Sequence, residues 1–379
     1  MNKFQFILVF ILFLLEFANE KLHFQVPVIP YSLGYLSFII GSFFLKPRYN
    51  RSYFMLSFIP IFLFWFGMFI GSFFANDINT SLGISIATLP YYLASAYFAY
   101  IFFEKKYKKI IIRSFIIILV INILYVLSHV IDGGEIISYS SFGEEYIRNH
   151  HNVGFLISIS AIFLSSYTLF NGKIKYSISI FIISTIFLLL TESRSNLIFY
   201  VTTYLLSLFI NYKFHKFLIN IALIMFLISP FYTSIFNYSH LSERFSTTDV
   251  DYHIESIDDR RMVLINAPDV VLSNIFGRGN KEFRIKVGSN NIVPHNMYLT
   301  SLLAGGVISF FSFLLIVYRS VISIRKLYKK SLLGPFEMSL ALVFLLISIT
   351  FLSIEFFGFN LLIYFSLYFY FNYKSSLIK

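Results

Sequence analysis

Arginine and histidine residues at the borders of apolar segments are the side chains of this chain best suited to chemistry. Arg194 lies in the short polar turn 192–196 between two apolar stretches, and Arg261 and His295 belong to the long polar segment 237–296. A guanidinium group binds two phosphate oxygens at once and stays charged at any working pH. An imidazole titrates near neutrality and can accept a proton from a hydroxyl group. These residue types suit a protein that holds a phosphorylated substrate and activates an alcohol.

Each of these residues also has a purely structural interpretation, which the sequence leaves open. Arg194 can pair with the neighbouring Glu192 or reach lipid headgroups. Arg260 and Arg261 follow two aspartates and can form exposed salt bridges, which contribute little to stability. His295 can simply cap the interface between the polar segment and the next apolar stretch.

The polar segment 237–296 is too long to be a mere connector, because loops beyond about 12–15 residues are usually functional or disordered. Arg260 precedes Arg261 within it, and Gly277 and Gly279 flank an arginine, where glycine permits close backbone approach. We expect Arg260, Gly277 and Gly279 to contribute to substrate binding. The pattern of residues 258–272 predicts an amphipathic helix that lies on the membrane or caps a cavity, with apolar positions at Met262, Leu264, Ile265, Val270 and Val271.

Three further residues are candidate substrate contacts at helix borders. Asn296 is a favourable N-cap for the apolar helix that follows it, and a helix N-terminus presents N–H groups and a positive dipole end to an anion. Arg148 and His151 end another polar loop and are second-rank candidates for binding the other substrate.

No metal or nucleotide site is expected. His150, His151 and His253 lack the spacing of metal ligands, the chain has no cysteine, and no P-loop or dinucleotide motif is present. We therefore expect chemistry that needs neither a metal nor a cofactor.

Composition places the chain in a membrane, because 57% of its residues are hydrophobic and only 13% are charged. Lipid offers no hydrogen-bond partners to backbone groups, so a spanning segment must be a helix or part of a closed β-barrel. The sequence lacks the alternating apolar and polar residues of a barrel, so the predicted fold class is all-α and polytopic. We expect a single integral membrane domain over residues 1–379 with about twelve spanning helices of about 20 residues each. The predicted spans are 4–19, 28–45, 53–74, 82–103, 110–131, 153–170, 176–191, 197–211, 217–236, 297–318, 337–353 and 356–372.

Basic residues concentrate in alternate loops, which predicts the orientation of the chain. Loops such as 46–51, 105–109 and 325–330 are rich in lysine and arginine, and are expected to be cytoplasmic together with both termini. The segment 237–296 then lies outside the cytoplasmic membrane. The net charge of +11 follows from this topology, so no nucleic-acid partner is expected.

The order of motifs in residues 176–318 resembles the O-antigen ligase/polymerase superfamily. The likeness rests on Thr191–Ser195 between two helices, on Arg261 fifteen residues before Gly277, and on His295-Asn296 with nine residues before Gly306. Two positions depart from the family pattern, because Ser309 replaces a glycine and Ile265 replaces a frequent tryptophan. Because neither position is a charged residue, these departures affect the assignment to a subfamily more than the assignment to the superfamily.

The resemblance implies glycosyl transfer on the outer face of the cytoplasmic membrane. The donor would be an oligosaccharide carried on undecaprenyl pyrophosphate, and neither a nucleotide sugar nor a metal would be needed. Arg194 and Arg261 would bind the pyrophosphate, and His295 would act as general base, the three meeting at the outer mouth of the helix bundle. The expected partners are this lipid-linked glycan, membrane lipid, a chain-length regulator and a flippase.

Three functions remain open at this stage. The leading hypothesis is a polymerase of O-antigen or capsular repeat units, and the nearest alternative is the ligase that transfers finished O-antigen to lipid A-core. A lipid-linked oligosaccharide flippase is the third, although carriers usually place polar residues at mid-membrane.

Overall fold

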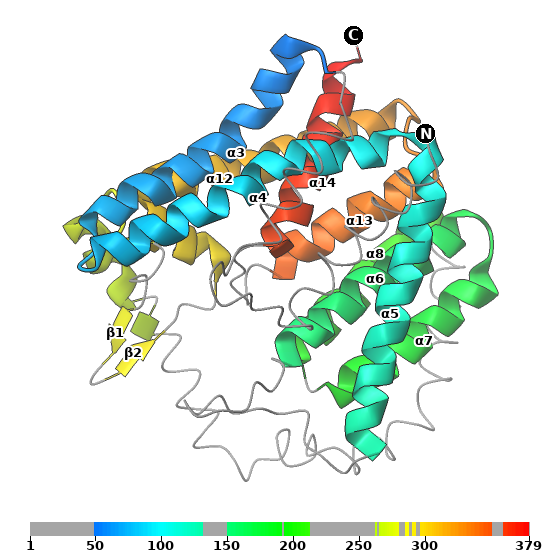
Figure 1. The fold of residues 1–379 in the computed structure, drawn as a ribbon. Coiled ribbons are helices and arrows are strands. Elements are labelled where there is room, and N and C mark those ends of the chain that lie inside the picture. The colour runs from blue at the N-terminus through cyan, green and yellow to red at the C-terminus, as the bar shows by residue number, and fades with distance from the viewer. Residues whose placement is uncertain are drawn as a thin grey trace. The chain divides into compact units, whose positions relative to one another are not determined.

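The structure is a computed structural model that describes residues 49–131, 150–191, 193–212, 262–263, 265–279, 285–287, 290–292, 296–350 and 359–378. Its described helices are α3 (Arg51–Gly71), α4 (Ile78–Phe103), α5 (Lys108–Ile131), α6 (His150–Phe170), α7 (Ile174–Leu190), α8 (Arg194–Asn211), α12 (Met297–Lys329), α13 (Pro335–Thr350) and α14 (Phe359–Ser376) (Figure 1). A short 3-10 turn, Ser72–Phe74, follows α3, and another, Lys105–Tyr107, precedes α5.

The helical, polytopic fold class is confirmed. Five helical stretches of the described chain are long and apolar enough to cross a membrane: Arg51–Phe74, Ile78–Phe103, Lys108–Ser128, Val153–Phe170 and Met297–Lys329. Shorter apolar helices account for three more of the predicted spans. The predicted spans 4–19, 28–45 and 217–236 lie outside the described residues.

A small β-hairpin, absent from the sequence-based expectation, lies within the polar segment. Its strands β1 (Ile285–Val287) and β2 (Asn290–Ile292) pair antiparallel, with Ile285 opposite Ile292. Ile285 is buried, so the hairpin contributes an apolar residue to the packing described below.

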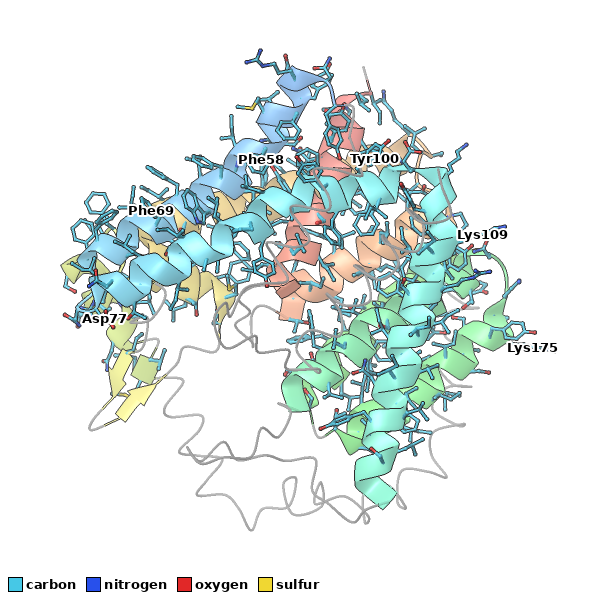
Figure 2. The ribbon with its side chains drawn as sticks, in the orientation of Figure 1. Phe58, Phe69, Asp77, Tyr100, Lys109 and Lys175 are labelled. Carbon is cyan, nitrogen blue, oxygen red and sulfur yellow. The ribbon has the colours of Figure 1, made fainter. Side chains whose placement is uncertain are left out.

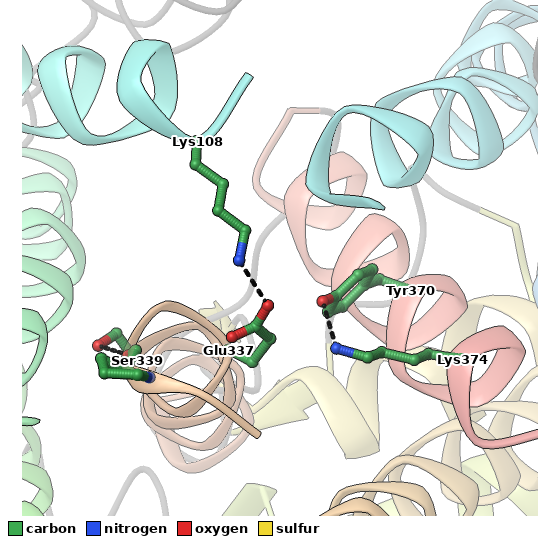
Figure 3. A network of polar contacts seen from close by, with 6 residues as sticks. Lys108, Glu337, Ser339, Tyr370 and Lys374 are labelled. Atoms are coloured by element: carbon green, nitrogen blue, oxygen red, sulfur yellow. Dashed lines mark hydrogen bonds and ion pairs between the residues drawn. The ribbon is translucent and has the colours of Figure 1, made fainter. Parts of the chain in front are cut away.

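The chain divides into two compact units, and α6 is central to the first, which also contains α5, α7, α8 and α13. Phe163 of α6 stacks on Phe115 of α5 at a centroid distance of 4.2 Å and meets Phe336 of α13 edge-on at 5.7 Å. At the first turns of α5 and α13, Lys108 Nζ lies 2.7 Å from Glu337 Oε1 (Figure 3). The lysine also lies over the ring of Phe336, so the charge pair is partly shielded from solvent.

The second unit contains α3, α4, α12 and α14, with α3 and α12 side by side (Figure 1). Ser309 Oγ of α12 donates to the carbonyl oxygen of Phe64 in α3 at 2.6 Å. Gly67 of α3 gives Ser309 its space, because a Cβ on Gly67 would lie 2.6 Å from the backbone nitrogen of Ser309. The serine that departs from the family's glycine pattern therefore fits because the facing helix is glycine at this level.

Aromatic rings cluster at the end of this unit where α3 begins and α14 ends. Tyr49 precedes α3, packs against Phe369 and Tyr373 of α14, and donates its hydroxyl to the carbonyl oxygen of Ala96 at 2.8 Å. Burial raises the pKa of the Tyr49 phenol above its ordinary value, so the hydroxyl stays neutral and keeps donating. Figure 2 shows Tyr100 toward this end of α4 and Asp77 at the opposite end, where α4 begins.

Helices that cross a membrane in alternate directions should have the start of one near the end of the next, and the helix ends of the second unit are arranged in this way. In the second unit, the start of α3 and the last turns of α12 and α14 lie together, since Asn50 N donates to Tyr373 Oη and Lys326 Nζ donates to the carbonyl oxygen of Ser375. The basic segments 46–51 and 325–330 were predicted to lie on the same side of the membrane, and their described residues are at this end. Which end faces the cytoplasm stays a prediction.

Helix α12 is longer than its predicted span 297–318, because it continues to Lys329. The predicted loop 325–330 therefore lies mostly within the last turns of this helix.

Candidate functional site

The long helix α12 is interrupted at Gly306. This residue has φ 64° and ψ −162°, a combination that is essentially restricted to glycine. The interruption separates a short half-helix, residues 297–305, from the long remainder of α12. In an unbroken helix the carbonyls of Leu303 and Ala304 would accept from the N–H groups four residues later, and the break releases them.

Residues 274–279 bind this interruption through their backbone, and we call them the latch. The N–H of Arg278 donates to the carbonyl of Leu303 and the N–H of Gly279 donates to the carbonyl of Ala304, both at 2.8 Å. In the opposite direction, the N–H of Val307 donates to the carbonyl of Ile275 at 3.0 Å. The latch thus satisfies backbone groups that could not be left unpaired in an apolar environment.

Glycine is required in the latch because the two backbones are in direct contact. Gly277 has φ 88° and is buried, and a Cβ at this position would lie 2.6 Å from the backbone nitrogen of Gly306. Gly279 has φ 78°, and a Cβ there would lie 3.0 Å from Cα of Ser72 at the end of α3. Their observed neighbours are protein atoms, so the predicted role of these glycines in substrate binding stays a prediction.

The residues before the latch are helical over 262–263 and 265–273, as predicted for this part of the polar segment. The apolar face differs from the expectation, because Met262 and Ile265 are exposed while Val263 and Ala267 are buried. This buried face packs against the half-helix of α12 and the hairpin, in a cluster made of Val263, Ala267, Ile285 and Leu303, flanked by Val270, Val271 and Leu299. The helix thus packs on protein through one face and leaves Met262 and Ile265 exposed.

Asn296 caps the half-helix, as predicted. Its Oδ1 accepts from the N–H groups of Tyr298 at 3.0 Å and Leu299 at 3.1 Å, and its backbone carbonyl accepts from Thr300 at 2.8 Å. The cap fixes the first turn of α12 directly after His295 in the sequence. Substrate binding by Asn296 stays a prediction.

In the other unit, Arg194 is the first residue of α8, and its backbone is held on α6. Ser193 and Asn196 on either side of it are buried, and Asn196 Nδ2 donates to Ser193 Oγ at 2.8 Å. A Cβ on Gly154 of α6 would lie 2.9 Å from Cβ of Ser193 and 3.0 Å from Nδ2 of Asn196. Ser158 Oγ, one turn along α6, lies 3.4 Å from the carbonyl oxygen of Asn196 and donates to it. We call this contact the α8 seat.

Several predicted site residues lie outside the described residues. These are Arg148, Arg260, Arg261 and His295, as well as Leu264 of the predicted amphipathic helix. Arg194 and His151 are described as helical backbone only, at the starts of α8 and α6. Their proposed convergence at one site therefore stays a prediction.

The structure adds residues that sequence reasoning did not select. Gly154, Ser193 and Asn196 form the α8 seat, and Ser72 supports the latch. Within the described ranges, no group of three or more His, Cys, Asp or Glu residues could hold a metal ion. Gly154 follows the predicted contact His151 by three residues, but a single glycine in an apolar helix carries no distinctive signal.

Together, the apolar helices, the interrupted α12 and the latch define an integral membrane protein in which a polar segment is built onto a helix break. Residues 179–314 match the family model described as O-antigen ligase, a range that includes the turn at Arg194, the polar segment and the break. This match confirms the resemblance to the O-antigen ligase/polymerase superfamily that the motifs indicated. The match supports a glycosyltransferase-like ligase or polymerase activity in general. No curated protein and no solved structure matches the chain.

Proposed function

We propose that the protein is a polysaccharide polymerase of the cytoplasmic membrane. It would transfer a glycan from undecaprenyl pyrophosphate to the non-reducing end of an acceptor repeat unit on the outer face. The observation that carries this proposal is the family match over residues 179–314, within which Arg194, Arg261 and His295 occur in the expected order.

The reaction needs three contributions, and the three residues supply them by type. Arg194 and Arg261 would hold the diphosphate and stabilise the charge that develops as it leaves the anomeric carbon. His295 would accept the proton of the attacking hydroxyl while the new glycosidic bond forms. Arg260 would assist the diphosphate contact, and Arg148 and His151 would contact the other substrate.

Two described features support this assignment of roles. The α8 seat fixes the backbone of Arg194 through buried neighbours, and the Asn296 cap fixes the helix that begins directly after His295. A backbone that is already fixed reduces the entropy lost when its side chain holds a substrate in a reactive geometry.

The variants Arg194→Ala, Arg261→Ala and His295→Ala test the proposal in cells that lack the native gene. Each should shorten the glycan ladder on gels to single repeats while immunoblots show normal protein. A normal ladder in all three variants would reject the assignment. Lys329→Ala, at the exposed end of α12, is a matched removal of a cation far along the sequence from these motifs and should leave the ladder unchanged.

A ligase that transfers glycan to lipid A-core is the second candidate, and it is favoured by the description of the matching family as O-antigen ligase. Deletion of the gene separates the two. Loss of a polymerase leaves single repeats attached to core, whereas loss of a ligase leaves long chains on undecaprenyl pyrophosphate.

A further inference from the structure

Two helical segments, whose described residues follow proposed site residues in the sequence, pack on each other. One is the helix of the polar segment, whose described residues are 262–263 and 265–273, and the other is the half-helix of α12, which begins at Met297 behind its Asn296 cap. Val263 and Ala267 of the first and Leu303 of the second belong to one buried cluster. In the sequence, Arg261 and His295 therefore precede the described residues of two helical segments that pack on each other.

The latch joins the same two segments a second time. It leaves the helix of the polar segment after Ser273 and binds the far end of the half-helix through the bonds to Leu303 and Ala304. The 3-10 turn that follows α3 also contacts the latch, because Phe74 stacks on Phe276 at a centroid distance of 5.4 Å. A Cβ on Gly71 of α3 would lie 3.0 Å from the carbonyl oxygen of Phe276.

This second attachment depends on the helix break. Without the break, the carbonyls of Leu303 and Ala304 would be engaged inside α12 and could not accept from the latch. Without glycine at 277, a side chain would separate the two backbones. The break and the latch therefore form one device, whose parts are far apart in the sequence.

We propose that this device holds the segments that carry Arg261 and His295 in a fixed relative position during glycosyl transfer. Gly277, Gly279 and Gly306 are then positioning residues, which act through the backbone and make no contact with substrate. The inference rests on the proposed function of Arg261 and His295. Displacement of a reacting group by about 1 Å can lower a rate by about 100-fold.

The first test is Gly277→Ala in purified protein reconstituted in lipid vesicles, with Gly172→Ala as the matched control. Gly172 also has positive φ, at 76°, but a Cβ there meets nothing within 4 Å. For Gly277→Ala we expect kcat to fall by about 100-fold, while the affinity for undecaprenyl pyrophosphate in the vesicles changes by less than threefold. Gly172→Ala should retain native turnover. Native turnover in Gly277→Ala, or a loss of affinity as large as the loss of kcat, would overturn the proposal.

The second test does not depend on the folding of a glycine variant. Because the chain contains no cysteine, the pair Ile275→Cys and Val307→Cys can be oxidised without background. These residues share a backbone hydrogen bond of 3.0 Å, which brings their backbones within the range that a disulfide spans, so oxidation should link them and leave turnover within twofold of the reduced form. Failure to cross-link, or turnover lost on oxidation and restored by reduction, would show that the latch is absent or must open.

The same protein separates this inference from the proposed function. His295→Ala placed in the cysteine-pair protein should cross-link normally and lack transfer. If it transfers glycan at the native rate, the proposed function fails while the cross-link still reports on the latch.

Discussion

Arg319 of α12 donates from Nη1 to the carbonyl oxygen of Leu56 in α3 at 2.7 Å. This carbonyl is the one that Pro60 leaves without a helical donor, because proline has no N–H to bind the residue four positions earlier. Arg319 of α12 therefore supplies the hydrogen-bond donor that a backbone carbonyl of the neighbouring α3 lacks. The contact explains why α12 continues past a charged residue where its apolar span was predicted to end.

Arg319→Met should destabilise the protein in detergent by about 1 kcal/mol, because it removes the hydrogen bond to the Leu56 carbonyl and the contact with Tyr368. In Pro60→Ala the new N–H can satisfy that carbonyl, so the same substitution should then cost less than about half as much. Denaturant unfolding of the four proteins in this cycle measures the difference. Equal costs in both backgrounds would contradict the role assigned to proline.

Gly306→Ala should lower the melting temperature, because positive φ with extended ψ costs a non-glycine residue about 1–3 kcal/mol. The added methyl group would also press on the backbone of Phe276. Gly83→Ala in α4 is the matched control, since a Cβ there meets nothing within 4 Å and alanine is the better helix former. Thermal unfolding followed by circular dichroism should move in opposite directions for the two variants. A melting temperature for Gly306→Ala equal to that of Gly83→Ala would argue against the helix break.

Gly154→Ala should shift Ser193 and thereby the start of α8, because the α8 seat has no room for a methyl group. We expect a shortened glycan ladder, similar to that of Arg194→Ala, at normal protein level. Asn196→Leu, which keeps the size of the side chain but loses the bond to Ser193, should have the same direction of effect. Native ladders in both variants would mean that Arg194 does not depend on this seat.

The sequence predicted most of the helices and the Asn296 cap because both depend on local properties. A bilayer requires long apolar helices, so spans such as 53–74 and 153–170 could be located from hydropathy alone. A cap needs only one polar side chain at a helix start. The motif order around Arg194, Arg261 and His295 likewise pointed to the superfamily that the comparison confirmed.

The tertiary structure decided where backbones meet. Hydropathy shows α12 as one continuous span, since the dihedral angles of Gly306 leave no trace in side-chain polarity. It also could not show that Val263 and Ala267, rather than Met262 and Ile265, face the core, because apolar residues surround that short helix on several sides. The latch, the α8 seat and the bond from Arg319 to Leu56 join residues that are distant in the sequence, and only folding brings such residues together.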